Sequence, residues 1–477
     1  MPSDVSPRAS KVTCRRFGTA TKVREESLAY FRRMKRRRRR LFLFFLGVDV
    51  SRTTTMSRAT LPPDTAAAVR GVLSTPLQTV LSALQDLPPP KHRRAPSAGP
   101  GGARFVGGAG HKPQRVVTLN HNCTVADALE MLARHRILSA PVIIQPDPLR
   151  ADDIHHERLE SDDARVEPPT LLGFFDIGDA LRCVVEELPE EDRVSHAPDH
   201  PRRNVLSWMR VMDGVERRVA NKRLVSVLGD DAELMYRADV GAHTLGETLR
   251  EGFLDGRSAN GAVHRIAIFD TNGEITRVVS MSDAVRYLAS RADHLGGLAE
   301  MNLRRLVLVG RASGIEGGLV VVPPTTPAIE AFALMREKRV SGVGVLDDRE
   351  GLIANLSASD LRCIQPEHFG ILGLPAAEFL ALLHGTSYAG FSRSRSAGAD
   401  NPFFAKMNEG GFRRAGPFLV IAAPDDPLGK VLSLIVEHGV HRVYVCEERD
   451  GKPLDVVTLT DVLRLACNAG EQDDKEP

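Results

Sequence analysis

The clearest pattern of apolar and polar positions lies near the end of the chain, at residues 418–467. A short apolar run at 418–421 leads into a turn rich in proline and aspartate, and apolar residues then recur at helical spacing over 428–436. Residues 440–445 alternate as a strand does, and residues 454–459 predict a second strand. The expected order is β-α-β-β-α, with a final helix, in about fifty residues. Such a segment is too small to bury a core alone.

The same order of elements recurs three more times, more loosely, earlier in the chain. Together the expected repeats cover residues 115–188, 238–292, 319–366 and 418–468. Repeats of this size predict units that bury their apolar faces against a neighbour of their own kind. Four copies therefore predict two pairs. The fold class follows as α/β (α+β), built from four β-α-β-β-α repeats.

The remaining segments are expected to flank or connect these repeats. They are a disordered, mis-annotated or targeting segment at 1–60, a helix with a flexible linker at 61–114, connectors at 189–237 and 367–417, an inter-module linker at 293–318 and a polar tail at 469–477. Apolar stripes at helical spacing occupy 73–84 and 205–227. Each stripe fits either a partner-docking helix or a helix that packs on the chain's own first pair of repeats, and we favour packing.

The N-terminal segment places a basic run at 35–40 directly before an apolar run at 41–46. The apolar run is far shorter than the roughly 20 residues that span a bilayer, so we expect no stable membrane insertion. The pattern fits a secretory signal, an organelle transit peptide, or a gene-model extension ahead of a true start at Met56. We favour the extension or plain disorder, because the basic run lies far from Met1 and no clear cleavage site follows.

Composition narrows the classes of partner. Lysine and arginine (63) nearly balance aspartate and glutamate (61), and aromatic residues make up only 5% of the chain, which does not favour nucleic acid. The six cysteines include no Cys-x-x-Cys pair, which indicates a reduced protein of the cytoplasm, the nucleus or both, without a cysteine-built zinc site. The acidic loop around His155-His156 is more typical of solvated surface than of a metal site.

Two short motifs distinguish the repeats from one another. A His-Arg doublet stands at the central strand of the second repeat (His264-Arg265) and of the fourth (His441-Arg442), while the third has Val-Ser-Gly-Val there. With these motifs the chain resembles proteins built from cystathionine-β-synthase (CBS) domains, whose tandem pairs are called Bateman modules. Four copies resemble the regulatory gamma subunit of AMP-activated or SNF1-related protein kinases, over roughly residues 115–467 with long insertions.

The resemblance implies a non-catalytic sensor of adenine nucleotides (AMP, ADP or ATP) with no cofactor, and it implies the kinase catalytic and beta subunits as partners. By resemblance, the aspartate of a Ser/Thr-x-x-Asp element binds ribose, and the His-Arg doublets reach phosphate. The candidate binding residues are His264, Arg265, Ser280, Ser282, Asp283, Ser357, Asp360, His441, Arg442, Thr458, Thr460 and Asp461. The chain has no Walker A loop, G-x-S-x-G elbow, H-E-x-x-H motif or kinase signature, so no catalytic residue is expected.

Each motif also has a purely structural interpretation. Ser or Thr before a first-turn Asp is an ordinary helix cap, and a His-Arg pair in a strand can simply face solvent. Their joint occurrence in two repeats, at nearly equal distances from Asp283 and Asp461, favours binding. In the first repeat Leu138 and Asp176 depart from the pattern, and the extra carboxylate would repel phosphate, which makes a nucleotide site there doubtful. The alternative function is a stand-alone CBS adaptor that regulates a partner without nucleotide, or through another adenosyl ligand such as S-adenosylmethionine.

Overall fold

The computed structural model describes eleven segments of the chain. They are residues 61–87, 116–144, 170–193, 204–228, 243–254, 263–270, 274–306, 319–362, 364–384, 419–447 and 451–471. All of them belong to one compact unit, Ala59–Pro477. The expectations for the N-terminal segment at 1–60 and for the loop around His155-His156 lie outside the described residues.

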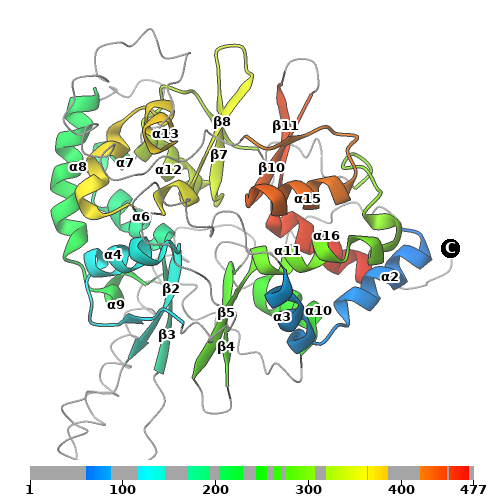
Figure 1. Cartoon of the computed structure of the whole chain (residues 1–477). Coiled ribbons are helices and arrows are strands. Elements are labelled where there is room, and N and C mark those ends of the chain that lie inside the picture. Colours follow the sequence, from blue (N-terminus) through cyan, green and yellow to red (C-terminus); the bar gives the residue numbers. More distant parts are fainter. Residues whose placement is uncertain are drawn as a thin grey trace, which may run out of the picture. The chain divides into compact units, whose positions relative to one another are not determined.

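Four small sheets follow one another along the described chain (Figure 1). The first holds β1 (Leu119–Asn120), β2 (Ser139–Ile144) and β3 (Thr170–Asp176), and the second holds β4 (Arg265–Phe269) and β5 (Ile275–Ser280). The third holds β6 (Val321–Val322), β7 (Gly342–Leu346) and β8 (Leu352–Ser357), and the fourth holds β9 (Ile421–Ala422), β10 (Arg442–Cys446) and β11 (Pro453–Thr458). In the three-stranded sheets the first strand runs parallel to the central strand and the last runs antiparallel to it.

Helices join and follow these strands in the predicted order. Those that join the first strand to the second are α4 (Val125–His135), α12 (Ala328–Glu337) and α15 (Leu428–His438), while α10 (Leu245–Glu247) and the π-helix η3 (Thr248–Phe253) precede the second sheet. Those that follow the last strand are α6 (Ile177–Glu186), α11 (Met281–Ser290), the 3₁₀ helix η6 (Ala358–Leu361) and α16 (Leu459–Gly470). The predicted mixed α/β class is confirmed.

The helix after the third sheet is only one turn long. Pro366 lies a few residues further on, and Gln365 before it is extended, with φ −122° and ψ 162°. A residue that precedes proline is pushed out of the helical region by the proline ring, so a longer helix cannot continue through this point.

The remaining helices lie between or before the four sheets. They are α2 (Pro63–Leu73), α3 (Leu77–Asp86), α7 (Glu190–Arg193), α8 (Val205–Ala220), α9 (Leu224–Val227), η4 (Ala292–His294), η5 (Gly296–Leu298), η7 (Pro366–Gly373) and α13 (Ala376–His384). Among the segments that the structure describes, no helix is both long and apolar enough to cross a membrane.

Packing against the chain itself explains both apolar stripes. Trp208 and Met212 on α8 are buried, and α8 packs against η7 and α6. Helix α3 packs against α11, and Arg277 of the second sheet donates to the Leu81 carbonyl at 3.1 Å. Both stripes therefore pack on the chain itself, but not on the first pair of repeats alone: α8 packs mainly against η7, which follows the third sheet, and α2 lies against α16, which follows the fourth.

The sheets meet one another through apolar clusters. The first and second sheets share a cluster of three buried residues, Ile143, Leu171 and Ala267. Phe174, Phe269 and Ile275 pack against this cluster. We call this contact the first–second seam. The third and fourth sheets share a cluster around Tyr444, Cys446 and Val456, which Leu352 joins from the third sheet. We call that contact, together with Ser341, Gly342, Asn355 and Arg442 at its polar end, the third–fourth seam.

The first and second sheets are also joined to the third and fourth. The largest cluster combines Val142 and Phe175 of the first sheet with Val343 and Leu356 of the third. Helix α11, after the second sheet, packs against α15 and α16 of the fourth. Segments hundreds of residues apart therefore bury each other's apolar faces, as small repeated units must.

Candidate functional site

Backbone pairing aligns equivalent residues of the four sheets. In each sheet, the first amide after the last strand donates to the carbonyl of the residue that precedes the central strand, at 3.0–3.2 Å. Those preceding residues are Leu138, His264, Ser341 and His441. The next residues, Ser139, Arg265, Gly342 and Arg442, pair with Asp176, Ser280, Ser357 and Thr458 respectively. The alignment places both His-Arg doublets at one equivalent position.

The predicted Ser/Thr-x-x-Asp elements form capping boxes. In each, the backbone N–H and the hydroxyl of the first residue donate to one carboxylate oxygen of the aspartate within 2.6–3.0 Å, in the pairs Ser280–Asp283, Ser357–Asp360 and Thr458–Asp461. The helix-cap interpretation is thereby confirmed. Ribose binding by these aspartates stays a prediction.

The last helix is capped by the first of its two candidate threonines. Thr458 rather than Thr460 is the N-cap of α16. The reason is that the Leu459 amide already donates to the His441 carbonyl, so the helix begins directly after the strand. The Thr460 hydroxyl instead lies 3.8 Å from the Met281 sulfur, which brings the starts of α16 and α11 together. Ser282, the residue that follows Met281, is half-buried in the first turn of α11.

The doublet of the fourth sheet reaches across to the third. Arg442 is only 7% exposed, and its Nη2 donates to Ser341 Oγ at 2.7 Å. His441 Nδ1 lies 3.4 Å from Ser359 Oγ, beside Asp360. Gly342 makes this approach possible, because a Cβ at that position would lie 2.0 Å from Arg442 Nη1. Both basic side chains are thus brought to the acidic helix start of the neighbouring sheet.

Two further residues hold this arrangement, and the sequence pattern had not singled them out. Tyr444 donates its hydroxyl to Asn355 Oδ1 at 2.8 Å across the third–fourth seam. Burial raises the pKa of Tyr444 to about 12, and the Arg442 guanidinium opposes that rise through its charge and a hydrogen bond. The Asp360 carboxylate adds to the rise, which shows that its charge also acts on this network. Alternating strand residues are expected in a core, so the pattern alone marked Tyr444 only as part of a strand.

The equivalent doublet of the second sheet is placed differently. His264 is exposed and Arg265 is half-buried at the start of β4. Ser139, equivalent to Gly342, is 8% exposed, and its hydroxyl has no hydrogen-bond partner among the described residues. The nearby Asp283 uses its second oxygen to accept from Arg286 Nη1 at 3.2 Å. Arg265 is therefore less deeply buried than the equivalent Arg442.

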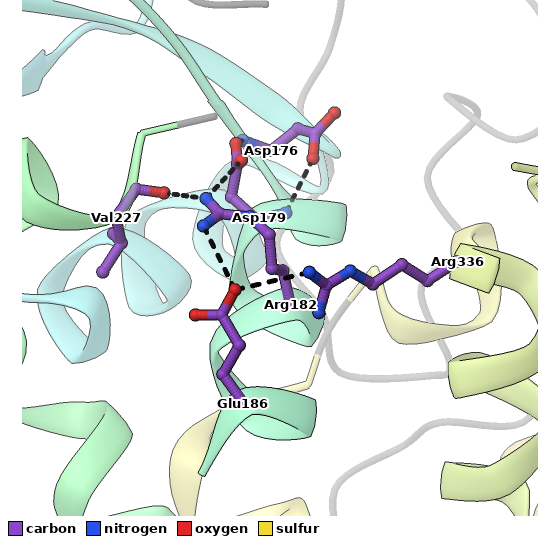
Figure 2. Close-up of polar contacts among 6 residues, drawn as sticks. All are labelled: Asp176, Asp179, Arg182, Glu186, Val227 and Arg336. Atoms are coloured by element: carbon purple, nitrogen blue, oxygen red, sulfur yellow. Dashed lines mark hydrogen bonds and ion pairs between the residues drawn. The ribbon is translucent and has the colours of Figure 1, made fainter. Parts of the chain in front are cut away.

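The first sheet carries a cluster of charged side chains at the start of α6 (Figure 2). Asp176 and Asp179 cap the helix reciprocally, each accepting from the other's amide at 3.0 Å. Arg182 donates to Asp179 at 3.1 Å and lies 3.7 Å from Glu186. Burial, reinforced by the Asp176 charge, raises the pKa of Asp179 to about 7, while Arg182 opposes the rise. Two acidic side chains therefore lie together at this helix start.

The same cluster connects two sheets. Figure 2 shows Glu186 between Arg182 of its own helix and Arg336 of α12, which belongs to the third sheet; the Arg336–Glu186 separation is 3.4 Å. Arg182 also donates to the Val227 carbonyl at the end of α9. A sequence signal for this cluster existed in the Asp-Ala-x-Arg motif, which occurs at 179–182 and again at 283–286.

The described cysteines offer no reactive thiolate. Burial raises the pKa of Cys123, Cys183, Cys446 and Cys467 to about 11, so these thiols stay protonated near neutral pH. Within the described ranges, no group of three or more His, Cys, Asp or Glu side chains is arranged to hold a metal ion.

Comparisons with known proteins bear on the same part of the chain. A family model of the CBS domain matches residues 317–365 and 417–468, which contain the third and fourth sheets. A CBS domain-containing protein of Dictyostelium discoideum is 30% identical over 100 residues, which cover 21% of this chain and 68% of that protein.

Solved structures are also similar to this chain at low sequence identity. A Methanocaldococcus jannaschii protein described as a putative archaeal homolog of g-AMPK covers 74% of this chain and 96% of its own, with 11% identity and a TM-score of 0.44. CBSX2 in complex with AMP covers 35% of this chain and 96% of its own, with 20% identity and a TM-score of 0.22. Similarity at this level says nothing of what this chain binds.

Proposed function

Because this chain belongs to the family of CBS-domain proteins, we propose that it is a non-catalytic regulatory protein that binds an adenine nucleotide. The observation that carries the proposal is the contact of Arg442 and His441 with the third sheet, next to the capped Asp360. A phosphate needs charge-assisted donors, and a guanidinium carries five N–H groups, more than Ser341 and Tyr444 engage. In this proposal Arg442 supplies the donor, at the seam between the third and fourth sheets.

The acidic helix starts would hold the ribose in this proposal. Asp461 and Asp360 each present a carboxylate at a fixed position, because the capping boxes lock their rotamers. A carboxylate can accept from both ribose hydroxyls, as in other nucleotide-binding folds. The remaining candidates, His264, Arg265 and Asp283, would serve a second site near the start of α11.

The finer role that we propose is that of a gamma-like subunit of an AMP-activated or SNF1-type kinase, with four CBS repeats and with the catalytic and beta subunits as partners. It rests on the His-Arg doublets in alternate repeats and on the Val-Ser-Gly-Val motif of the third. Nucleotide would regulate the kinase only through different affinities for two conformations of the complex. Co-expression and co-purification with a SNF1-type catalytic subunit and beta subunit tests this role. The complex is expected in the cytoplasm or the nucleus.

A stand-alone adaptor is the second candidate. The observation in its favour is that the candidate aspartates are already engaged in capping boxes, and Asp283 uses both oxygens within its own helix. An adaptor of this kind would need no nucleotide, or would bind another adenosyl compound.

Calorimetric titration of the full chain with AMP, ADP, ATP and S-adenosylmethionine separates these candidates. We expect at least one adenine nucleotide to bind, and we expect Asp461→Asn to weaken it about tenfold, since the amide keeps the cap but loses the carboxylate charge. Asp127→Asn is the matched control, because Asp127 occupies the same capping position in α4, away from the seam. Folded protein that binds none of the four ligands would favour the adaptor.

A further inference from the structure

A series of charged side chains joins α6, which follows the first sheet, to α12 of the third sheet (Figure 2). Arg182 donates to Asp179 Oδ1 at 3.1 Å through Nη2, and its Nη1 lies 3.7 Å from Glu186 Oε1. The same Glu186 oxygen accepts from Arg336 Nη2 at 3.4 Å. Two arginines from different sheets therefore face one carboxylate oxygen, and only Arg336 is close enough to donate to it.

The charge of Asp179 determines whether Arg182 is available to Glu186. An ionised Asp179 holds the guanidinium of Arg182 by a charge-assisted hydrogen bond. Burial, reinforced by the Asp176 charge, raises the pKa of Asp179 to about 7, so this charge is gained or lost near neutral pH. The Asp179 side chain is 13% exposed, and that exposed edge lets the proton exchange with water.

The two guanidinium groups of the cluster repel each other. Burial lowers the pKa of Arg336, Glu186 opposes that change, and the Arg182 charge adds to it. Because arginine stays protonated in proteins, the repulsion acts on the positions of the two side chains and leaves their charges unchanged. An Arg182 that moved onto Glu186 would therefore push Arg336 away from the oxygen that they share.

The elements packed against α6 besides α12 are α8, α9, β3 and η6. At these contacts the charged side chains are Arg218 and Lys222 near the end of α8, Asp176 at the end of β3, and Asp360 and Arg362 of η6. Arg218 and Lys222 are paired with Glu187, at the opposite end of α6 from Asp179, and Asp360 caps its own helix. Among the described residues, Glu186 is therefore the other carboxylate that Arg182 reaches.

From this arrangement we propose that the cluster is a proton-operated link between α6 and α12. An ionised Asp179 holds Arg182 and leaves Glu186 to Arg336, whereas a protonated Asp179 releases Arg182, which turns to Glu186 and displaces Arg336. Helix α12 leads through residues 338–340 to Ser341 and Gly342, beside Arg442, so the link adjoins the third–fourth seam. The link needs no nucleotide and is independent of the function proposed above.

Double-mutant cycles on the full chain test this link. Glu186→Gln and Arg336→Gln, alone and together, give the coupling between the two side chains from urea unfolding at pH 6 and pH 8. Both side chains are nearly half exposed, so these variants are expected to fold. We expect the coupling to change the unfolding equilibrium constant about threefold at pH 8 and to vanish at pH 6. The Glu130–Arg134 pair of α4, an exposed ion pair at 2.7 Å within one helix, is the matched control and should show equal coupling at both pH values.

Two further variants identify the group that titrates. In Asp179→Asn, whose side chain is neutral at every pH, the Glu186–Arg336 coupling should be absent at both pH values. Asp176→Asn keeps a capping side chain but removes the charge that raises the pKa of Asp179, so the loss of coupling should move to lower pH. Equal coupling at pH 6 and pH 8 in the wild-type background, including none at either, would overturn the proposal. A pH dependence that survives in Asp179→Asn would overturn it as well.

Discussion

Replacing Arg442 by alanine is expected to weaken AMP binding about 100-fold and to leave the chain folded. The variant loses the guanidinium that lies at the polar end of the third–fourth seam, within 2.7 Å of Ser341 Oγ. Tyr444 keeps its hydrogen bond to Asn355, so the seam retains its other polar contact. Calorimetric titration gives the affinity, and thermal unfolding of the same samples reports the fold.

Two further variants sharpen this result. Arg442→Lys keeps the positive charge but loses the planar guanidinium and its paired N–H donors. Its affinity for AMP should therefore fall between those of wild type and Arg442→Ala. Arg349→Ala is the matched control, because Arg349 is exposed in the turn at the opposite end of β7. Unchanged AMP affinity in Arg442→Ala, or an equal loss in Arg349→Ala, would contradict the assignment of the phosphate donor.

Replacing Asp179 by asparagine is expected to stabilise the protein at pH 8 and to have little effect near pH 4. The Asp179 side chain is 13% exposed, and its pKa is raised to about 7, from 3.8, by burial and by Asp176. Between about pH 4 and pH 7 the folded chain therefore retains a proton that the unfolded chain has lost. Wild-type stability falls as pH rises through this window, and the neutral asparagine avoids that loss while it still accepts from the Asp176 amide.

The gain in the free energy of unfolding at pH 8 should be on the order of 2 kcal/mol. It is smaller than the shift in the pKa of Asp179 alone would give, because Arg182 loses a charged partner in the variant. Urea unfolding at a series of pH values measures it. Asp127→Asn should show the opposite trend, since hydrogen bonds from Thr124 hold the pKa of Asp127 below its usual value. That variant is therefore expected to lose stability at neutral pH and to match wild type in acid. A pH-independent difference for Asp179→Asn would show that Asp179 is ionised throughout.

The order of elements was predictable because it depends on local pattern. Apolar spacing located α15 and the strands β10 and β11 to within about two residues, which is the usual error at element ends. The capping boxes were predictable for the same reason, since a cap needs only residues three apart in the sequence. The short η6 departed from the other repeats because Pro366, at the last position of the predicted third repeat, keeps Gln365 out of a helical conformation.

The network at the third–fourth seam could not be predicted in this way. Ser341 and Arg442 are about one hundred residues apart, and only the register of two packed sheets brings their side chains together. Tyr444 looked like any alternating strand residue, because its polar partner Asn355 belongs to a different repeat. The motif comparison identified the His-Arg doublets as a pair, but it could not show that Arg442 is buried and bonded to Ser341.

Amide hydrogen–deuterium exchange with and without AMP tests the central claim most directly, because it locates the bound nucleotide on the chain. The account predicts that AMP slows exchange at residues 341–342, 357–360 and 441–442, and that Arg442→Ala abolishes this protection at the same AMP concentration. Protection confined to other segments of a chain that does bind AMP, or no change anywhere in folded protein, would contradict it.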